Sequence, residues 1–463
     1  MVKNVTLDQI VSLCKRCGFV YPTSEIYGGL ASSYDYGPLG TELLRNIKNS
    51  FWRYFVTNRS DIVGLDSQII LHPKTWEASG HTTGFVEPVV EDTITKRRYR
   101  ADHLVEDFVK GKEKFKDFVV EELDTKGLDG FIKAHNIKSP DGNTLSVSKF
   151  FNTLVETKLG VLEGKKNIAY LRGETAQGIF SNFKNVIDST RIRLPFGIAQ
   201  IGKSFRNEIT KGQFVFRTVE FEQAEIEYFF NPGESRWKDL YKDWQDQMLR
   251  FVTEILGVDK NNLTWRRHTD RERSHYSRET YDLDYRFPFG YKELWGIAYR
   301  TDFDLKSHAK YTGVDFSYTD LISGRKFIPH VIEPAVGINR VFLMILCDSY
   351  KKDVKNKRLY LSLKPFLAPY KVAVFPLVRN NKEIVKKSRE VFNNLKGHFS
   401  AIFDDRGNIG KRYFAQDEVG TPWCVTIDYD SLKDNTVTIR DRDTTKQKRI
   451  KISELKNFVL FNI

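Results

Sequence analysis

Apolar and polar residues repeat along this chain with two periods, and each period predicts one kind of secondary structure. A spacing of three to four residues is typical of helices with one buried side, and strict alternation is typical of half-buried strands. The helical spacing predicts helices over residues 5–15, 41–57, 175–187, 237–256 and 338–346. Strands are predicted over residues 62–71, 277–287, 293–308 and 326–334. Mixed strands and helices predict an α/β (α+β) fold.

The chain changes character at two places, and these changes predict its domain boundaries. Residues 110–166 are lysine-rich with little strand pattern, so we expect a mainly helical insertion. Pro365 and Pro369 mark a linker, and strands and helices alternate beyond it, which predicts a small mixed or parallel sheet. The expected C-terminal elements are strands over 371–376, 399–403, 421–428 and 436–440 and helices over 382–395 and 410–417. The expected domains are a core over 1–109 and 167–364, the insertion over 110–166, and a C-terminal domain over 369–463.

The stretch from residue 205 to residue 228 combines a strand pattern with many charged side chains. It predicts two strands joined by a tight connection at residues 209–213. Alternation places Arg206 and Glu208 on one face of the first strand. On the second strand it aligns Val215, Arg217, Val219, Phe221, Gln223 and Glu225. Because ionised side chains are seldom buried without partners, this face is either the exposed side of a hairpin or the binding surface for a charged planar ligand.

Composition adds a candidate partner. The 463 residues suit roughly three domains of ~150 residues, and 40% hydrophobic with 29% charged residues is typical of a soluble protein. The net charge of +13 indicates either a polyanionic partner such as nucleic acid or a lysine-rich bias without a partner. The N-terminus lacks a signal pattern, and the longest apolar run is far too short to span a membrane.

The cysteines bear on compartment and metal binding. The chain has four, Cys14, Cys17, Cys347 and Cys424, too few for a disulfide framework, and we expect a reducing cytoplasm. Cys14 and Cys17 have the spacing of half a zinc site. No second cysteine pair exists to complete a four-cysteine site, although histidine ligands stay open. We therefore expect two incidental thiols and no structural zinc.

The charged stretch resembles the second signature motif of class II aminoacyl-tRNA synthetases. The resemblance rests on Phe205-Arg206-x-Glu208, a loop, and then Arg217-x-x-x-Phe221. In that family the first arginine grips the α-phosphate of ATP and the phenylalanine stacks under the adenine. The sequences of its two segments, FRNE and EFEQAEIEYF, are similar to those of glycyl-tRNA synthetases of the single-chain, homodimeric type.

Two further stretches resemble the other motifs of that class. Glu333-Pro-x-x-Gly337-x-x-Arg340 resembles the third motif, whose arginine holds the γ-phosphate. The helix over 41–57 and the strand that ends before Pro73 resemble the first motif, which forms the dimer interface in the family. Ordinary helix–strand units share that periodicity, so the homodimer rests on the resemblance. The implied fold is an antiparallel sheet flanked by helices, with a C-terminal α/β anticodon-binding domain.

The resemblance implies a glycine–tRNA ligase, which activates glycine with ATP and Mg²⁺ and transfers it to the 3′-terminal adenosine of tRNA(Gly). The implied catalytic residues are Arg206, Arg217 and Arg340. The implied ATP contacts are Arg206, Asn207, Glu208, Phe216, Arg217, Phe221, Glu293, Leu294, Gly337 and Arg340. The implied glycine contacts are Arg100, Glu174, Phe221, Gln223, Glu225, Glu333 and Gly337. Glu293 is also a candidate carboxylate at or behind a magnesium ion, because magnesium takes hard oxygen ligands, and the alternative is a solvated carboxylate on a strand.

The C-terminal domain is expected to bind tRNA. Residues 369–463 hold 18 Lys and Arg against 12 Asp and Glu, a net charge of +6. They resemble the anticodon-binding domain that glycyl, threonyl, prolyl and histidyl enzymes share. The expected contacts are Arg440, Arg442 and Arg449. The basic insertion either touches the acceptor stem of tRNA or is simply solvated.

Four positions depart from the family pattern and keep an alternative open. The family usually has arginine, serine, aspartate and proline where this chain has Val219, Ala335, Asn339 and Gly173. The alternative is a synthetase-like protein that binds nucleic acid without activating an amino acid. Against it, the chain retains Arg206, Glu208, Arg217, Phe221, Glu225 and Arg340. A sibling enzyme for threonine, proline or histidine is disfavoured by the EFEQAEIEYF segment.

Overall fold

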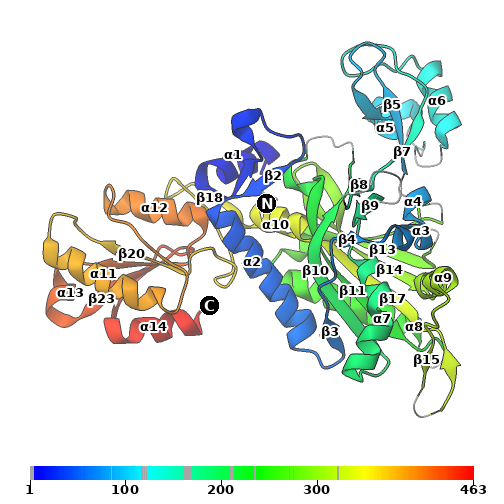
Figure 1. Ribbon diagram of the computed structural model, residues 1–463. Coiled ribbons are helices and arrows are strands. Elements are labelled where there is room, and N and C mark those ends of the chain that lie inside the picture. Colours follow the sequence, from blue (N-terminus) through cyan, green and yellow to red (C-terminus); the bar gives the residue numbers. More distant parts are fainter. Residues whose placement is uncertain are drawn as a thin grey trace.

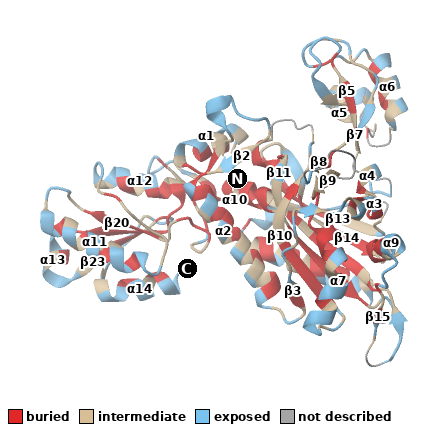
Figure 2. Cartoon of the chain, viewed as in Figure 1, coloured by how far each residue is buried: buried red, intermediate tan, exposed pale blue. Residues whose placement is uncertain are grey.

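The computed structural model has a central body with a small body and a C-terminal body on either side of it (Figure 1). It describes residues 5–84, 86–115, 118, 120, 123–160, 168–208, 213–233, 236–270, 272–274, 276–320 and 323–463. Buried residues follow the sheets and the inward sides of the helices in each body, so each body has a core of its own (Figure 2). Within these ranges, no helix combines the length and apolar character needed to cross a membrane.

The central body is built on a seven-stranded sheet with the order β12-β13-β14-β17-β11-β10-β3. In that order the strands are Leu263–Arg267, Glu279–Phe287, Gly290–Thr301, His330–Gly337, Glu220–Phe230, Phe196–Phe205 and Ile62–Gly64. Neighbouring strands are antiparallel, except that β10 and β3 run parallel. This arrangement confirms the antiparallel sheet flanked by helices.

Alternation along β11 gives the sheet two different faces. Ala224, Ile226 and Tyr228 belong to the main apolar cluster, which they share with four helices. These helices are α1 (Leu7–Cys17), α2 (Pro38–Trp52), α8 (Trp237–Arg250) and α10 (Ile338–Ser349). On the opposite face Phe229 packs in a second cluster with α7 (Ala176–Thr190) and α9 (Phe303–Thr312). Polar side chains of β11 share this second face with Phe229.

The small body contains strands and begins earlier than the expected insertion. It consists of β5 (Val86–Glu91), β6 (Arg98–Arg100), β7 (Lys149–Asn152), α5 (Ala101–Val109) and α6 (Thr125–Ala134). Its core is formed by Val90, Ala101, Val105, Val120, Leu128 and Ile132. The boundary expected at residue 110 cuts through this core, and the described part of 110–166 contains the strand β7 as well as the helix α6. The next strand, β8 (Val155–Lys158), already pairs with β9 (Ile168–Leu171) beside β4 (Ile70–Leu71).

Three predicted strands are divided in the structure. The strand expected over 326–334 forms β16 (Lys326–Phe327) and part of β17, which lie in different sheets. The strand expected over 62–71 forms β3 and β4, which lie in different sheets. The strand expected over 293–308 ends at Thr301 and continues as α9. Thr301 has φ of 58°, a left-handed conformation that breaks the extended chain. The predicted helices over 41–57 and 237–256 end in π turns over Arg53–Thr57 and Phe251–Ile255.

The C-terminal body is a mixed five-stranded sheet with the order β21-β20-β22-β23-β24. In that order the strands are Ala401–Phe403, Val372–Pro376, Trp423–Ile427, Thr436–Asp441 and Gln447–Lys451. Its helices are α11 (Lys382–Lys396), α12 (Ile409–Val419), α13 (Tyr429–Asp434) and α14 (Ile452–Phe461). The predicted strand–helix alternation is confirmed. A hairpin of β18 (Tyr350–Asp353) and β19 (Arg358–Leu361) leads into this body from α10.

The remaining short elements lie around the central sheet. They are β1 (Val20–Pro22), β2 (Tyr34–Tyr36), α3 (Pro73–Ala78), α4 (His81–Gly84), β15 (Tyr318–Thr319) and β16 (Lys326–Phe327). A 3₁₀ turn over Phe214–Phe216 lies in the connection between β10 and β11. All three of its residues are buried, and this anchors the connection against the core.

Candidate active site

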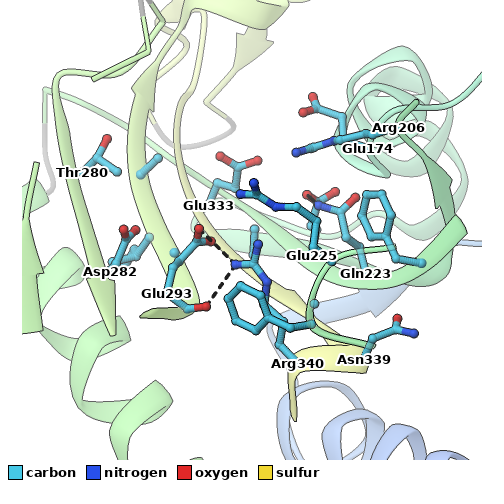
Figure 3. Close-up of a pocket in the computed structure, with 18 of the residues that line it drawn as sticks. Glu174, Arg206, Gln223, Glu225, Thr280, Asp282, Glu293, Glu333, Asn339 and Arg340 are labelled. Carbon is cyan, nitrogen blue, oxygen red and sulfur yellow. Dashed lines mark hydrogen bonds and ion pairs between the residues drawn. The ribbon is translucent and has the colours of Figure 1, made fainter. Parts of the chain in front are cut away.

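A cavity of about 320 Å³ opens on the face of the central sheet that carries α7 and α9 (Figure 3). Strands β11, β13, β14 and β17, the start of α10 and the β10–β11 connection supply its lining. Twelve residues singled out by the sequence line it: Glu174, Arg206, Glu208, Phe216, Arg217, Phe221, Gln223, Glu225, Glu293, Glu333, Gly337 and Arg340. Segments that are far apart in the chain therefore meet in one hollow.

Arg206 and Phe221 form one part of the cavity. The Arg206 guanidinium lies 5.4 Å from the centre of the Phe221 ring. Its Nε donates to the carbonyl oxygen of Gly173 at 2.9 Å, and its backbone N–H donates to that of Val219 at 2.9 Å. A cation and an aromatic plane held side by side suit a phosphate joined to a planar base.

Two more arginines reach the cavity, each beside a carboxylate. Arg217 Nε lies 3.3 Å from Glu208 Oε2. Arg340 Nη1 lies 3.0 Å from Glu293 Oε2 and donates to the Glu293 carbonyl oxygen at 3.0 Å (Figure 3). The Arg340 guanidinium also lies 4.6 Å from the centre of the Phe216 ring. These contacts orient both guanidinium groups and leave them within reach of a polyanion.

Three buried carboxylates form the opposite part of the cavity. Glu225 Oε2 accepts hydrogen bonds from the backbone N–H and the hydroxyl of Thr175, and Oε1 accepts one from Gln223 at 2.9 Å. Glu174 Oε2 lies 3.2 Å from His81 Nε2. Their exposed fractions are only 4% for Glu174 and 2% for Glu225.

The third carboxylate, Glu333, is held by a buried arginine. Its Oε1 lies 2.8 Å from Nη1 of Arg300, which also pairs with Asp304 at 2.8 Å. Figure 3 shows Glu333 and Glu225 directed into the same space. Behind them, Glu227 is fully buried, and neither of its carboxylate oxygens has a hydrogen-bond partner among the described residues.

Burial and neighbouring charges shift the pKa values of these three carboxyl groups. Burial would raise the pKa of Glu174, but His81 and Arg300 hold it below its usual range. Burial and the charge of Glu174 raise the pKa of Glu225. Burial raises the pKa of Glu333 to about 8, although Arg300 opposes that shift. A small cation between these groups would relieve their repulsion, as an ammonium group does.

Two carboxylate oxygens between the arginines and the sheet suit a magnesium ion. A Cβ atom built on Gly296 would lie 3.6 Å from Asp282 Oδ1 and 3.9 Å from Glu293 Oε1, so both oxygens face the same small space. Magnesium bound with a nucleotide usually takes one or two carboxylates and completes its shell with phosphate and water. The described residues contain no group of three or more side chains arranged to hold a metal by themselves.

Comparison with known proteins identifies the family. Residues 371–462 match the family model described as an anticodon binding domain. Glycine–tRNA ligases of Staphylococcus haemolyticus and Staphylococcus epidermidis are each 47% identical to this chain over 466 residues, covering 99% of either sequence. The chain belongs to the glycine–tRNA ligase family. The glycine–tRNA ligase of Staphylococcus aureus is likewise 47% identical over 460 residues, or 98% of each chain.

Three residues that the family resemblance singled out do not line the cavity. Leu294 is fully buried in the main apolar cluster on the other face of the sheet. The backbone N–H of Asn207 donates to the carbonyl oxygen of Thr153 at 2.8 Å. Arg100 lies in the small body, where it pairs with Glu87 and Asp102. Their roles in this glycine–tRNA ligase family member therefore stay predictions.

The expected tight hairpin is wrong in its geometry, although its residues do meet. β10 ends at Phe205 and β11 begins at Glu220, so Arg206, Glu208 and Arg217 lie in the long connection and not on strands. The expected turn at 209–213 lies, except for residue 213, outside the described residues. The 214–216 turn in this connection is buried in the main apolar cluster. Val219 is absent from the described lining, and its N–H donates to the carbonyl oxygen of Ser32 at 3.2 Å.

Two of the three expected tRNA contacts are also wrong. Arg440 is 5% exposed, and its guanidinium makes two hydrogen bonds to Asp417 at 2.8 and 2.9 Å. Arg442 is 2% exposed and donates to the carbonyl oxygens of Gly420 and Leu363. Both groups are used inside the fold, where a phosphate has no access. Arg449 is partly exposed and pairs with Asp428 at 2.7 Å.

The sequence reasoning missed several residues that complete the site. His81, Thr175 and Arg300 hold the acidic groups in place, and Asp282 lines the cavity with His268. His268 Nε2 lies 2.8 Å from Asp282 Oδ2, and this hydrogen bond raises the pKa of His268. The spacing of Arg300 and Asp304 and the position of Thr175 next to Glu174 were available signals. His81 and His268 carried no such local signal.

Proposed function

We propose that this chain activates glycine with ATP to glycyl-adenylate and then transfers glycine to the 3′-terminal adenosine of tRNA(Gly), releasing pyrophosphate and AMP. The observation that carries this proposal is the single cavity that joins Arg206, Arg217 and Arg340 to the buried acidic pocket. Membership of the glycine–tRNA ligase family supports the same activity. A nucleotide and a small ammonium compound would lie side by side there.

In the first step the glycine carboxylate attacks the α-phosphate of ATP. That carboxylate is already ionised near pH 7, so the attack needs no general base. The protein supplies position and positive charge, with Arg206 at the α-phosphate and Arg217 and Arg340 at the outer phosphates. Phe221 stacks on the adenine. Glu293 and Asp282 would hold magnesium, which would supply positive charge near the outer phosphates.

The acidic pocket selects the amino acid. Glu174, Glu225 and Glu333 would receive the ammonium group, and Thr175 and Gln223 hold Glu225 in the required rotamer. Glycine offers no side chain to grip, so such a site discriminates by leaving no room for a larger one. Walls formed by buried, mutually hydrogen-bonded side chains are suited to that exclusion because they yield little.

Transfer requires tRNA, and the exposed basic side chains of α11 are the better candidates for contacts in the C-terminal body. A hollow of about 400 Å³ there is lined by Arg379, Lys382, Val385, Lys386, Arg389, Glu390 and Asn393. Exposed lysine and arginine side chains neutralise phosphates, so this surface is a candidate binding site for a polyanion. Anticodon bases are unpaired, so side chains around this hollow can also reach their edges.

We also propose that the protein is a homodimer in the cytoplasm. The segment before α2 exposes Ile26 by 88%, Tyr27 by 86% and Leu30 by 66%, and such apolar groups are unfavourable in water. The described cysteines are all free, which suits a reducing compartment. Sedimentation equilibrium tests the dimer: a monomer at micromolar concentration would contradict it.

Pyrophosphate exchange with ATP across the twenty amino acids tests the activity. Exchange should occur with glycine and magnesium, and with no other amino acid at comparable efficiency. Charging of tRNA(Gly) transcripts should follow in the same preparation. A folded protein that exchanges with no amino acid but still binds tRNA would favour the nucleic-acid-binding alternative.

A further inference from the structure

A buried group of ion pairs joins the central body to the C-terminal body. Arg358 of β19 places Nη1 2.8 Å from Oδ2 of Asp417 in α12. The same Asp417 accepts both hydrogen bonds from Arg440. The side chains of Arg358 and Asp417 are 1% and 0% exposed. Asp417 therefore lies between one arginine of its own body and one from the central body.

Arginines of both bodies donate hydrogen bonds across this junction. Arg358 also donates to the carbonyl oxygens of Arg442 at 2.6 Å and Asp443 at 3.1 Å. In return, Arg442 donates to the carbonyl oxygen of Leu363 at 2.8 Å. A Cβ atom on Gly420 would lie 2.6 Å from Leu363 Cδ1, so the backbone at Gly420 packs closely against the Leu363 side chain. The junction is packed and hydrogen-bonded on both sides.

Arg358 is connected to the active site by continuous secondary structure. Helix α10 begins with the turn that carries Arg340 in the cavity and runs directly into β18. β18 pairs with β19, which carries Arg358, and the N–H of Ser362 donates to the carbonyl oxygen of Ser349 at 2.8 Å. The arginine at the cavity and the arginine at the junction therefore lie on one helix–hairpin unit.

We propose that Arg358 is a positioning residue for tRNA charging, which fixes the C-terminal body on the α10 hairpin so that a tRNA held by its anticodon presents its 3′ end to the cavity. This inference rests on the proposed function. A tRNA bound at both ends converts a small rotation at the junction into a large displacement of its acceptor end. Transfer to the terminal ribose is sensitive to displacements of about 1 Å. Glycyl-adenylate formation uses only the central body and does not depend on the junction.

Arg358→Met tests the inference, because it removes the guanidinium and leaves Asp417 paired with Arg440. Pyrophosphate exchange with glycine should stay within about twofold of the parent chain. For full-length tRNA(Gly), kcat/KM of charging should fall at least about tenfold, whereas charging of an acceptor-stem minihelix should not change. Arg358→Lys should recover part of the loss. The matched control is Arg406→Met, which removes an arginine of the C-terminal body whose side chain is 86% exposed.

A second variant tests the inference independently in case Arg358→Met does not fold. Arg16→Gln removes the contact between α1 and α12, in which Arg16 Nη1 lies 2.5 Å from Glu418 Oε2 at the edge of the same junction. It should lower charging of full-length tRNA in the same direction by a smaller factor. Unchanged charging in both variants would overturn the inference, and so would equal losses for tRNA and minihelix. Absence of glycine-dependent exchange in the parent chain would instead refute the proposed function.

Discussion

Arg340 holds Glu293 through both its side chain and its backbone: Nη1 lies 3.0 Å from Oε2 and 3.0 Å from the carbonyl oxygen. The pair joins the first turn of α10 to β14 across the cavity. Burial would raise the pKa of Glu293, but Arg340, Arg206 and Arg217 lower it, so this carboxylate is ionised at neutral pH. Under the proposed function, Arg340 would bind phosphate and Glu293 would bind magnesium.

Glu293→Gln should separate these two roles. The amide still accepts a hydrogen bond from Arg340 but no longer attracts a divalent cation. We expect a magnesium requirement raised at least about tenfold and a lower maximal exchange rate, because a charge near the developing transition state is lost. Magnesium titrations of pyrophosphate exchange measure this. Glu220→Gln, on an exposed residue at the start of β11, is the control, and equal titration curves would refute the magnesium role.

Arg206→Ala should reduce the rate of glycine activation by about 10²–10³, the typical effect of removing one charge-stabilising donor. Its stability cost should be small, because the lost side chain lies at the cavity and not in the apolar core. Stopped-flow or exchange kinetics give kcat, and thermal unfolding gives Tm. Arg193→Ala, on an exposed residue in the loop after α7, is the control. A change in kcat below about tenfold would mean that Arg206 does not contact the α-phosphate.

Binding of glycine should strengthen as pH rises toward 8. The raised pKa of Glu333 keeps this carboxyl protonated and neutral at lower pH, and deprotonation near pH 8 adds a negative charge for the ammonium group. KM for glycine should therefore fall between about pH 6 and 8. Glu333→Gln should raise KM and flatten the profile. Glu222→Gln, on the other face of β11, should keep the slope, and a Glu333 variant with the parental slope would disprove the assignment.

The surface of α11, and not the buried arginines, should carry the electrostatic contacts to tRNA. Lys386→Ala and Arg389→Ala should each weaken tRNA binding and reduce the slope of log affinity against log salt by about 1. Filter binding or anisotropy at several salt concentrations measures both quantities. Arg449→Ala is the comparison, because its ion pair with Asp428 is partly exposed. Unchanged slopes in both α11 variants would place the tRNA contacts elsewhere.

Local patterns predicted most of the secondary structure. The helices α1, α2, α7, α8 and α10 were visible because their apolar residues recur at helical spacing along one segment. Four of the five strands of the C-terminal body were predicted from short strand-like segments between turns and helices, whereas β24 was not predicted. The small body was not, because its core combines residues from Val90 to Ile132 that no single periodic segment contains.

Chemical identity also predicted the cavity better than geometry did. Arg206 and Arg217 were expected to meet through strand alternation, yet they line one cavity from the connection between β10 and β11. In that case the residue types predicted correctly which groups line the cavity. For Arg440 and Arg442 the residue type led to a wrong prediction of tRNA contacts. A guanidinium group that can bind phosphate can equally donate hydrogen bonds to Asp417 and to buried carbonyl oxygens inside the fold.

The sequence by itself determined the periodic elements, the family and the kinds of group that meet at the cavity, because each of these depends on residues that are neighbours in the chain or on side-chain chemistry alone. The tertiary structure decided which charged groups are accessible. Arg358 and Asp417 lie 59 positions apart, and only packing of the two bodies makes them partners. Burial and ion pairing depend on the surroundings that distant segments create, and those surroundings decide whether an arginine holds the fold together or holds a substrate.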